Sequence, residues 1–213
     1  PNGEQVILDI VQLPHLFVVG STMSGKTVFL QAILLSLIAR LQPDQLELLI
    51  IDPKATDFVL YNGLPYLRGG RVFTEAEEAV EQLRQLTDEE LRERTRILQQ
   101  ARCPNLSEYN TANPDRTLKP IVVVIDEYAD LMAVLTKKER QDFEREINRL
   151  AQRARSVGIH LVLATQRPTA DIVTGLLKAN MPCRVSFRLP QRVGSQTILD
   201  QTGAVNLFGG GDM

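Results

Sequence analysis

Residues 20–27 read GSTMSGKT and match the pattern G-x-x-x-x-G-K-[ST], which binds phosphate when it joins a strand to a helix. The apolar run HLFVV at residues 15–19 comes before it and suits a buried strand. The apolar run VFLQAILL at residues 28–35 follows and suits a buried helix. A Gly/Ser turn before an ordinary helix is the alternative, but both flanks favour a phosphate-binding loop.

The residue types of this loop indicate how it would hold a nucleotide. Gly20 and Gly25 allow the backbone to turn tightly and to approach a phosphate. The amide groups of residues 22–27 can bind an anion at the start of the helix. Lys26 would reach the β- and γ-phosphates of ATP, and the Thr27 hydroxyl would bind Mg²⁺. The predicted nucleotide-binding residues are Gly20, Ser21, Thr22, Met23, Ser24, Gly25, Lys26 and Thr27.

A second motif lies at the end of the most strand-like run, IVVVI at residues 121–125. Asp126 would hold Mg²⁺ through water, and Glu127 would orient and activate the attacking water. An apolar strand that ends in Asp-Glu is a weak signal alone. Downstream of a phosphate-binding loop it becomes strong, because a parallel sheet brings both strand ends to one edge.

Two further apolar runs end in polar residues at the same predicted edge. The run at 46–51 ends in Asp52 and Lys54, for which ligand binding and an ordinary charged loop both remain open. The run at 159–164 ends in Thr165, Gln166 and Arg167, and the polar side chains at this tip could sense the γ-phosphate.

The alternation of apolar runs and helical segments predicts an α/β fold with a mainly parallel β-sheet flanked by helices. Residues 1–213 suit one domain, and 44% hydrophobic residues suffice for a full core. The chain starts without Met and stops after GGGDM, so we expect it to be excised from a longer protein.

The remaining elements are expected from local patterns. Thr74 and Thr87 each begin a capping-box pattern, so one long helix or two helices with a break are possible after residue 74. The other expectations are a strand at 5–10, a first helix ended by Pro43 and Asp44, loops at 58–73 and 102–119, a helix at 138–156, a short helix within 169–182, a strand at 184–189 and a small helix within 194–213.

The charge is balanced, with 24 Lys and Arg against 26 Asp and Glu, so any DNA contact must be local or arise on assembly. Arg145, Arg149 and Arg153 form a stripe on the helix at 138–156. A salt-bridged surface is favoured for this stripe, and a basic face toward a neighbouring subunit is the alternative.

The cysteines and histidines predict no further site. Cys103 and Cys183 are far apart in sequence and suit free thiols in a reducing compartment. His15 and His160 lie at the edges of apolar strands and are expected to be satisfied structural residues.

Several stretches together resemble the motor domain of the FtsK/SpoIIIE DNA translocases, in the HerA/FtsK branch of P-loop ATPases. The resemblance covers residues 14–213 and is specific because the motifs are long and in the family's order. The stretches are PHL at 14–16, the loop at 20–27, IDPK at 51–54, VIDEYADLM at 124–132, GIHLVLATQRP at 158–168, KANMP at 178–182 and TILDQ at 197–201.

The resemblance implies a RecA-like P-loop NTPase core that assembles as a homo-hexameric ring and pumps double-stranded DNA with ATP and Mg²⁺. It implies Gln166, with Thr165, as the sensor and Asp126 and Glu127 as the second motif. Such proteins act in the bacterial cytoplasm in chromosome partition, cell division or sporulation, and relatives act in conjugation. Full-length members carry an N-terminal membrane part, so the parent is expected at the inner face of the cell membrane.

The chain departs from the family pattern at three places. Met23 replaces a glycine, which would strain the loop if that position needs a positive φ. Gln196 replaces an arginine of the family, and residues 72–100 diverge, which suggests a side branch of the family.

A DNA pump needs charge from a neighbouring subunit to complete its site, and the sequence leaves the source of that charge open. The candidate arginine fingers are Arg153, Arg155 and Arg184. The candidate contacts to DNA phosphates are Lys137, Lys138 and Lys178, each of which also suits plain surface.

Two other functions stay open. The first is an ATPase of a secretion or conjugation system that acts on protein or on plasmid transfer, since type VII secretion ATPases use related domains. The second is a non-hydrolysing scaffold, which the presence of both Asp126 and Glu127 disfavours.

Overall fold

The computed structural model describes residues 9–10, 13 and 15–213. The strand expected at residues 5–10 falls almost entirely outside these residues. Within them, five strands form one sheet in the order β2-β3-β4-β1-β5, and every neighbouring pair is parallel, as predicted. The strands are β1 (Leu16–Val19), β2 (Glu47–Ile51), β3 (Ile121–Ile125), β4 (Ile159–Thr165) and β5 (Cys183–Ser186).

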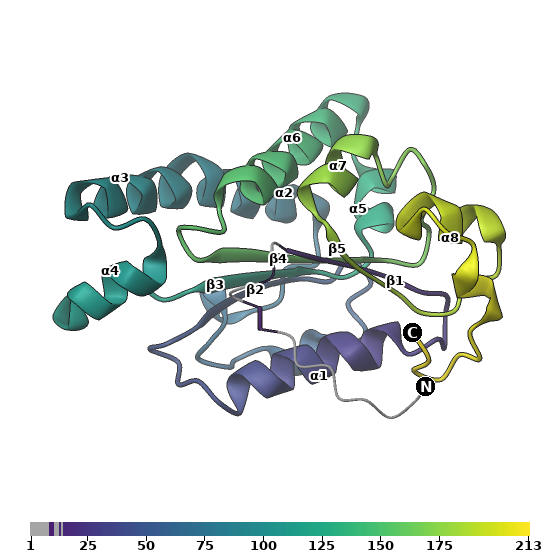
Figure 1. Ribbon diagram of the computed structural model, residues 1–213, viewed down its shortest axis with the longest axis horizontal. Coiled ribbons are helices and arrows are strands. Elements are labelled where there is room, and N and C mark those ends of the chain that lie inside the picture. The colour runs from purple at the N-terminus through teal and green to yellow at the C-terminus, as the bar shows by residue number, and fades with distance from the viewer. Residues whose placement is uncertain (1–8, 11–12, 14) are drawn as a thin grey trace.

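Helices cover both faces of this sheet (Figure 1). Helix α1 lies on one face, and α2, α3, α5, α6 and α7 lie on the other, while α8 sits at the end next to β5. Their bounds are α1 (Lys26–Ile38), α2 (Ala76–Gln85), α3 (Leu91–Ala101), α4 (Leu106–Ala112), α5 (Tyr128–Val134), α6 (Lys137–Arg153), α7 (Gly175–Asn180) and α8 (Arg192–Leu199).

The buried strands serve two cores because successive side chains point to opposite faces. On β2, Leu48 and Ile50 pack in the core under α1, whereas Leu49 and Ile51 pack under the α2–α6 layer. This explains why these strands read as continuous apolar runs rather than alternating ones.

The register brings the carboxyl ends of the central strands together. Val19 of β1 pairs with Thr165 of β4, and Ile51 of β2 pairs with Ile125 of β3. The loops that follow β1, β2, β3 and β4 therefore share one edge, which is the edge at which parallel sheets bind ligands.

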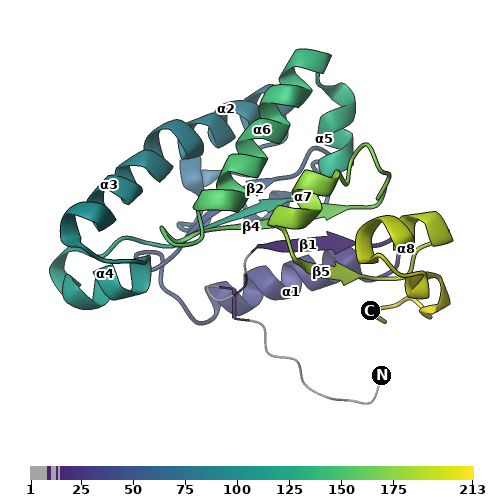
Figure 2. The ribbon, with the colours of Figure 1, turned by 45° about the horizontal axis from the view of Figure 1, so that its top comes forward.

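The segment after Thr74 forms one continuous helical run with an irregular turn in it, so the first of the two alternatives is confirmed. Helix α2 begins after Glu75, which has an extended backbone, and neither Thr74 nor Thr87 caps a helix, so both predicted caps are wrong. Residues 86–90 form a π-helical turn that joins α2 to α3 without a break (Figure 2). The buried Thr87 hydroxyl donates instead to the Glu146 carboxylate of α6, so the chain stays helical there.

Two short helices were not expected from the sequence. Helix α4 lies inside the segment 102–119, which was expected to be loop; the Asn105 side chain caps it by accepting the Glu108 N–H. Helix α5 follows Glu127 directly. The first helix also ends earlier than expected, at Ile38 rather than at Pro43. None of the helices in the described ranges is long and apolar enough to cross a bilayer.

The two histidines are buried at the amino ends of the central strands. The Nδ1 of His15 accepts the Leu161 N–H at 2.9 Å. Within the described part of the chain neither ring nitrogen of His160 nor the Nε2 of His15 has a hydrogen-bond partner, so the expectation of satisfied residues is wrong for His160 and half met for His15. Burial lowers the pKa of each histidine to about 4. Cys103 and Cys183 are both free thiols, as expected.

Candidate functional site

The loop between β1 and α1 adopts a conformation that needs its glycines. Gly25 has φ 111° and precedes α1, and a Cβ there would lie 2.8 Å from the backbone of Gly211. A Cβ on Gly20 would lie 2.8 Å from the Cβ of Phe187. Met23 also has a positive φ, of 62°, which confirms the strain expected where the family has glycine.

Segments far away in sequence hold this loop. The Ser21 N–H and hydroxyl both donate to the carbonyl of Arg188, each at 3.0 Å. The Gly211 N–H donates to the Ser24 carbonyl at 2.9 Å. The loop is therefore fixed by the segment after β5 and by the glycine-rich C-terminal residues.

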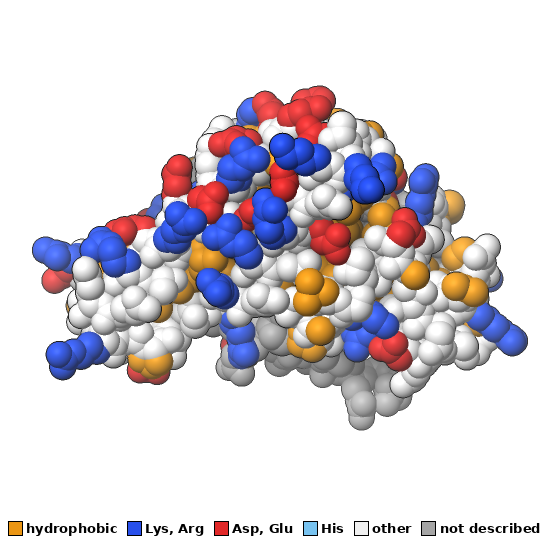
Figure 3. Space-filling view, turned by 90° about the horizontal axis from the view of Figure 1, so that it is seen from above, with side chains coloured by type: hydrophobic (Ala, Val, Ile, Leu, Met, Phe, Trp, Pro, Cys, Tyr) orange, Lys and Arg blue, Asp and Glu red, His pale blue; other side chains and the backbone are white. Residues whose placement is uncertain are grey.

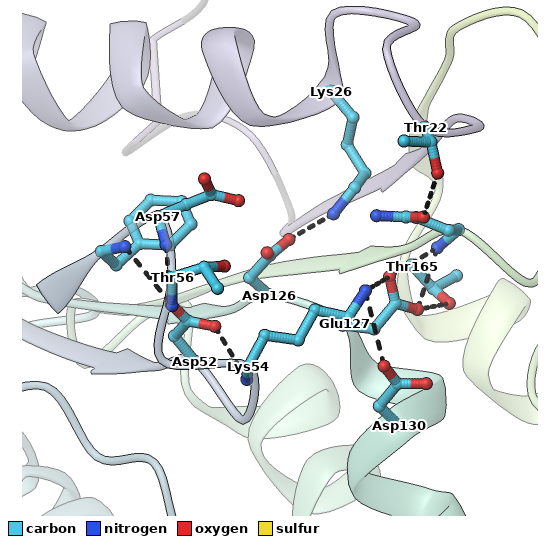
Figure 4. Close-up of polar contacts among 12 residues, drawn as sticks. Thr22, Lys26, Asp52, Lys54, Thr56, Asp57, Asp126, Glu127, Asp130 and Thr165 are labelled. Carbon is cyan, nitrogen blue, oxygen red and sulfur yellow. Dashed lines mark hydrogen bonds and ion pairs between the residues drawn. The ribbon is translucent and has the colours of Figure 1, made fainter.

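Lys26 and Asp126 form a buried ion pair across the ends of β1 and β3 (Figure 4). Each is 2% exposed as a residue, so each charge depends on the other for compensation. Burial raises the pKa of Asp126, and the attraction of Lys26 offsets this in part. The two residues that were predicted to bind phosphate and Mg²⁺ thus lie side by side.

The donor set suits Mg²⁺ rather than a metal held by a full protein cage. The predicted ligands, Thr27 and Asp126, offer hard oxygen atoms. No group of three or more His, Cys, Asp or Glu side chains that could hold a metal occurs among the residues that the structure describes. Mg²⁺ fits such a sparse site because it keeps water and substrate phosphates as its other ligands.

Glu127 stands at the start of α5. Its backbone conformation is unusual, and both oxygens of its carboxylate accept hydrogen bonds. Its φ is 59°, a left-handed conformation that is costly for a residue with a side chain. Its side chain is 1% exposed. The carboxylate accepts from the Thr165 hydroxyl at 2.8 Å and from the Gln166 N–H at 3.0 and 3.1 Å.

Gln166 connects Glu127 to the phosphate-binding loop. Its main-chain N–H donates to Glu127, and its side-chain oxygen accepts the Thr22 hydroxyl at 2.9 Å. The residue predicted to sense the γ-phosphate therefore contacts both the loop and the predicted base.

Asp52 and Lys54, whose roles the sequence left open, have different functions in the structure. The fully buried Asp52 carboxylate accepts the N–H groups of Lys54, Thr56, Asp57 and Phe58, so it shapes the loop after β2. Lys54 extends from that loop to Glu127, with Nζ 3.3 Å from Oε2, and to Asp130, 3.4 Å away.

The charge of Lys54 is stabilised by these acids. Burial acts to lower the pKa of Lys54, but the attraction of Glu127 and then of Asp130 outweighs it, so the pKa lies above its usual value. Lys54 remains protonated in any working pH range and forms a permanent positive charge beside Glu127.

A cavity of about 530 Å³ opens beside the loop, a size typical of small-molecule sites. Lys26 and Gln166 line its polar part, and Phe29 and Phe187, whose rings meet edge to face at 5.6 Å, line its apolar part. Its other lining residues are Ser21, Thr22, Met23, Gly25, Thr27, Val28, Ala32, Asp57, Gly210, Gly211 and Met213.

The candidate arginine fingers lie away from this cavity. Arg153 ends α6 and Arg155 precedes β4, so both lie toward the amino end of β4, opposite the loop edge. Arg184 lies on β5, where it donates to the Ile198 carbonyl and pairs with Asp200 at 2.9 Å.

The candidate DNA contacts also lie outside the cavity. Lys137 and Lys138 are exposed at the start of α6. Lys178 pairs with Asp200 at 2.7 Å.

The arginine stripe of α6 is largely a salt-bridged surface. Arg145 pairs with Asp142 at 2.8 Å, and Arg149 pairs with Asp88 and Glu146 at 3.1 and 2.9 Å. Figure 3 shows basic and acidic side chains interspersed over this helical layer. For these two arginines the favoured interpretation of the sequence is confirmed.

Several contributors to the site were not predicted from the sequence. Asp130 follows Glu127 by three residues at the start of α5, a spacing that places both on one side of a first helical turn and that could have identified it. Phe187 and Gly211 had no local signal, because only the fold brings them to the loop.

A sequence model described as the FtsK/SpoIIIE family matches residues 2–170. The DNA translocase FtsK of Pasteurella multocida is 41% identical over all of this chain, which covers 25% of that protein. The DNA translocase FtsK of Campylobacter jejuni is 44% identical over 99% of this chain, which covers 22% of that protein. The chain thus spans about a quarter of the length of these two relatives.

Solved structures agree with this match. The pCW3 conjugation coupling protein TcpA, with ATPγS, superposes with a TM-score of 0.82 at 31% identity, covering 96% of this chain and 57% of that one. The cytoplasmic domain of the Thermomonospora curvata type VII secretion ATPase EccC superposes with a TM-score of 0.77 at 24% identity, covering 91% and 23%. The second likeness supports the fold alone.

Proposed function

Because this chain belongs to the FtsK/SpoIIIE family, we propose that it is the ATP-hydrolysing motor domain of a double-stranded DNA translocase. The observation that carries the proposal is the meeting of Lys26, Asp126 and Glu127 at one edge of the sheet, beside a cavity large enough for a nucleotide. These are the groups that phosphate binding, Mg²⁺ binding and water activation require.

Each side chain has a defined task in hydrolysis. Lys26 exchanges its contact with Asp126 for the β- and γ-phosphate oxygens. Thr27 and Asp126 would hold Mg²⁺, which supplies positive charge that neutralises the phosphates. Glu127 orients the attacking water and takes its proton on a carboxylate oxygen. Gln166, between Thr22 and Glu127, is placed to respond to the γ-phosphate.

The proposal includes a homo-hexameric ring that encloses the DNA. Arg153 and Arg155 lie at the opposite end of β4 from their own loop, so either would act on the site of a neighbouring subunit. The guanidinium of Arg184 is bonded to the Ile198 carbonyl and to Asp200, and it would have to leave both to act on a neighbouring site.

The DNA contacts in this proposal are to the phosphate backbone. Lys137 and Lys138 are the better candidates because they are exposed, whereas Lys178 is already paired with Asp200. We place the ring in the bacterial cytoplasm, with the parent protein anchored at the inner face of the membrane, in chromosome partition at division. The naming of the relatives as DNA translocases supports DNA as the substrate.

The test is the ATPase rate of the purified domain with and without linear double-stranded DNA, at low and moderate salt. We expect strong stimulation by DNA that weakens as salt rises, because contacts to phosphates release counterions. Absence of stimulation at every protein concentration that gives assembly would contradict a DNA motor.

A second candidate is an ATPase of a conjugation or secretion system. The match to a conjugation coupling protein at 31% identity is the observation that favours it. Stimulation by a protein substrate with no response to DNA would support the export function in place of the DNA motor.

A further inference from the structure

Each oxygen of the Glu127 carboxylate already accepts two contacts in this structure, because the Gln166 N–H is shared between them. A carboxylate offers about four lone-pair sites for hydrogen bonds. Oε1 accepts from the Thr165 hydroxyl and the Gln166 N–H, and Oε2 accepts from the Gln166 N–H and from Lys54 Nζ. A base that orients a water must offer that water one of these positions, so one contact has to break before hydrolysis.

Of the three donors, Lys54 is the one that can leave. Thr165 is the last residue of β4, and its hydroxyl also accepts the Arg167 N–H at 3.1 Å, so it is fixed in place. The Gln166 N–H belongs to the backbone directly after the strand. The Lys54 side chain is 36% exposed, and its contact at 3.3 Å is the longest of the four.

Lys54 also has a second carboxylate within reach. Asp130 lies one helical turn after Glu127, and its Oδ2 is 3.4 Å from Lys54 Nζ. Arg167 competes for Asp130 only weakly, since the atoms are 4.0 Å apart and its side chain is 71% exposed. The ammonium group can therefore leave Glu127 for Asp130 and still keep an ion pair (Figure 4).

We propose that Lys54 is a positioning residue that acts as a latch on Glu127, with Asp130 as its alternative partner. When Lys54 bonds Oε2, it blocks the position that the attacking water needs. When Lys54 bonds Asp130 alone, Oε2 is free to accept the proton. The inference rests on the proposed role of Glu127 as the base, and it assigns to the loop after β2 the control of when that base is available.

The test compares the steady-state ATPase of Lys54→Met and Asp130→Asn with that of the unmodified chain, with and without linear double-stranded DNA. Lys54→Met should raise kcat without DNA by about fivefold to tenfold, the change that ~1–1.4 kcal/mol makes in a rate. It should also shrink the stimulation by DNA and leave KM unchanged. Asp130→Asn should lower kcat, because Lys54 then has only Glu127 as a partner.

The double variant Lys54→Met with Asp130→Asn should behave as Lys54→Met alone, since Asp130 acts only through Lys54. Lys54→Arg should restore the low rate without DNA because it keeps the positive charge beside Glu127. A kcat for Lys54→Met that is equal to or below that of the unmodified chain, with ATP binding intact, would overturn the latch. If Lys54→Met does not fold, a rise or no change in kcat for Asp130→Asn overturns it.

A second measurement detects the contact without hydrolysis. The double variant Lys54→Met with Glu127→Gln should lower the melting temperature by less than the sum of the two single variants, because both remove the same ion pair. Additive shifts would show that the pair does not form in solution and would overturn the latch. A Glu127→Gln variant that hydrolyses ATP normally would instead remove the base role on which the inference rests, so the two failures are distinguishable.

Discussion

The two ends of the same parallel strands bury ionisable groups in opposite ways. At the carboxyl end, Lys26, Asp126 and Glu127 are buried, and each has charged or hydrogen-bonding partners. At the amino end, His15 and His160 are buried about as deeply, yet burial holds the pKa of each near 4, so both are neutral at pH 7.

The difference follows from what each end of a strand offers. Helices α1 and α5 begin at the carboxyl edge, where their free N–H groups favour negative charge, and the loops add donors such as the Gln166 N–H. At the amino end, burial and then the positive charges of Arg155 and Arg94 lower the pKa of His160, and among the described residues Asp9 acts in the other direction. The buried ionisable groups are therefore compensated by partners at the carboxyl end, whereas at the amino end burial favours the neutral form of the imidazoles.

The largest expected effect comes from removing the charge of Glu127. Glu127→Gln keeps the shape and the contact from the Gln166 N–H but cannot take a proton from water. We expect kcat to fall by about 10²–10⁴-fold, the usual contribution of a general base, while ATP still binds. Single-turnover hydrolysis and binding of labelled ATP measure the two effects. Normal turnover would show that the carboxylate of Glu127 has only a structural role, as the neutral histidines have at the amino end.

The next prediction separates the two roles of Lys26, which are the binding of ATP and the compensation of the buried Asp126. Lys26→Ala should abolish measurable ATP affinity and also destabilise the fold by ~3–5 kcal/mol, because it leaves Asp126 buried without a partner. Adding Asp126→Asn should recover much of the stability but none of the affinity. Calorimetric titration with ATP and urea unfolding measure these changes. ATP binding by Lys26→Ala would contradict the assignment of the loop.

The sequence could predict features that depend on local patterns, and it could not predict those that depend on tertiary contacts. The motif at 20–27 and the pair Asp126-Glu127 were predictable because their spacing and flanking apolar runs are local. Phe187 and Gly211 were not, since the pairing of β5 with β1 brings Phe187 to the loop and the C-terminal segment brings Gly211 there. The capping pattern at Thr87 misled because its hydroxyl contacts Glu146 of α6 and the Leu83 carbonyl of the preceding turn rather than an N–H of the following turn.

The neutral histidines predict a loss of stability in mild acid. In the folded chain they stay neutral down to about pH 4, whereas in the unfolded chain they take up protons below about pH 6.5. The unfolded state therefore binds more protons between these values, and the free energy of unfolding falls as pH drops through this window. The upper limit is roughly 3 kcal/mol for each histidine.

His160→Met tests this, since methionine has a similar volume and cannot titrate. The variant should lose about half of the decrease in unfolding free energy between pH 6.5 and pH 5, where most carboxylates do not yet titrate. Urea unfolding at a series of pH values measures the slopes. Equal slopes for the two proteins would mean that the amino end does not depend on neutral imidazoles.

The smallest effect concerns backbone strain at the carboxyl end. Met23 has φ 62° and is 93% exposed, so its side chain contributes little packing to offset the cost of a left-handed conformation. Met23→Gly should raise the free energy of unfolding by up to ~1 kcal/mol, because the relief of strain exceeds the added entropy of the unfolded chain. Gly25→Ala in the same loop is the matched opposite, since its φ is 111° and the new Cβ would meet Gly211 at 2.8 Å. Urea unfolding measures the change in the free energy of unfolding, which should be a rise for Met23→Gly and a fall for Gly25→Ala. A loss of stability in Met23→Gly would mean that Met23 makes contacts that outweigh the strain.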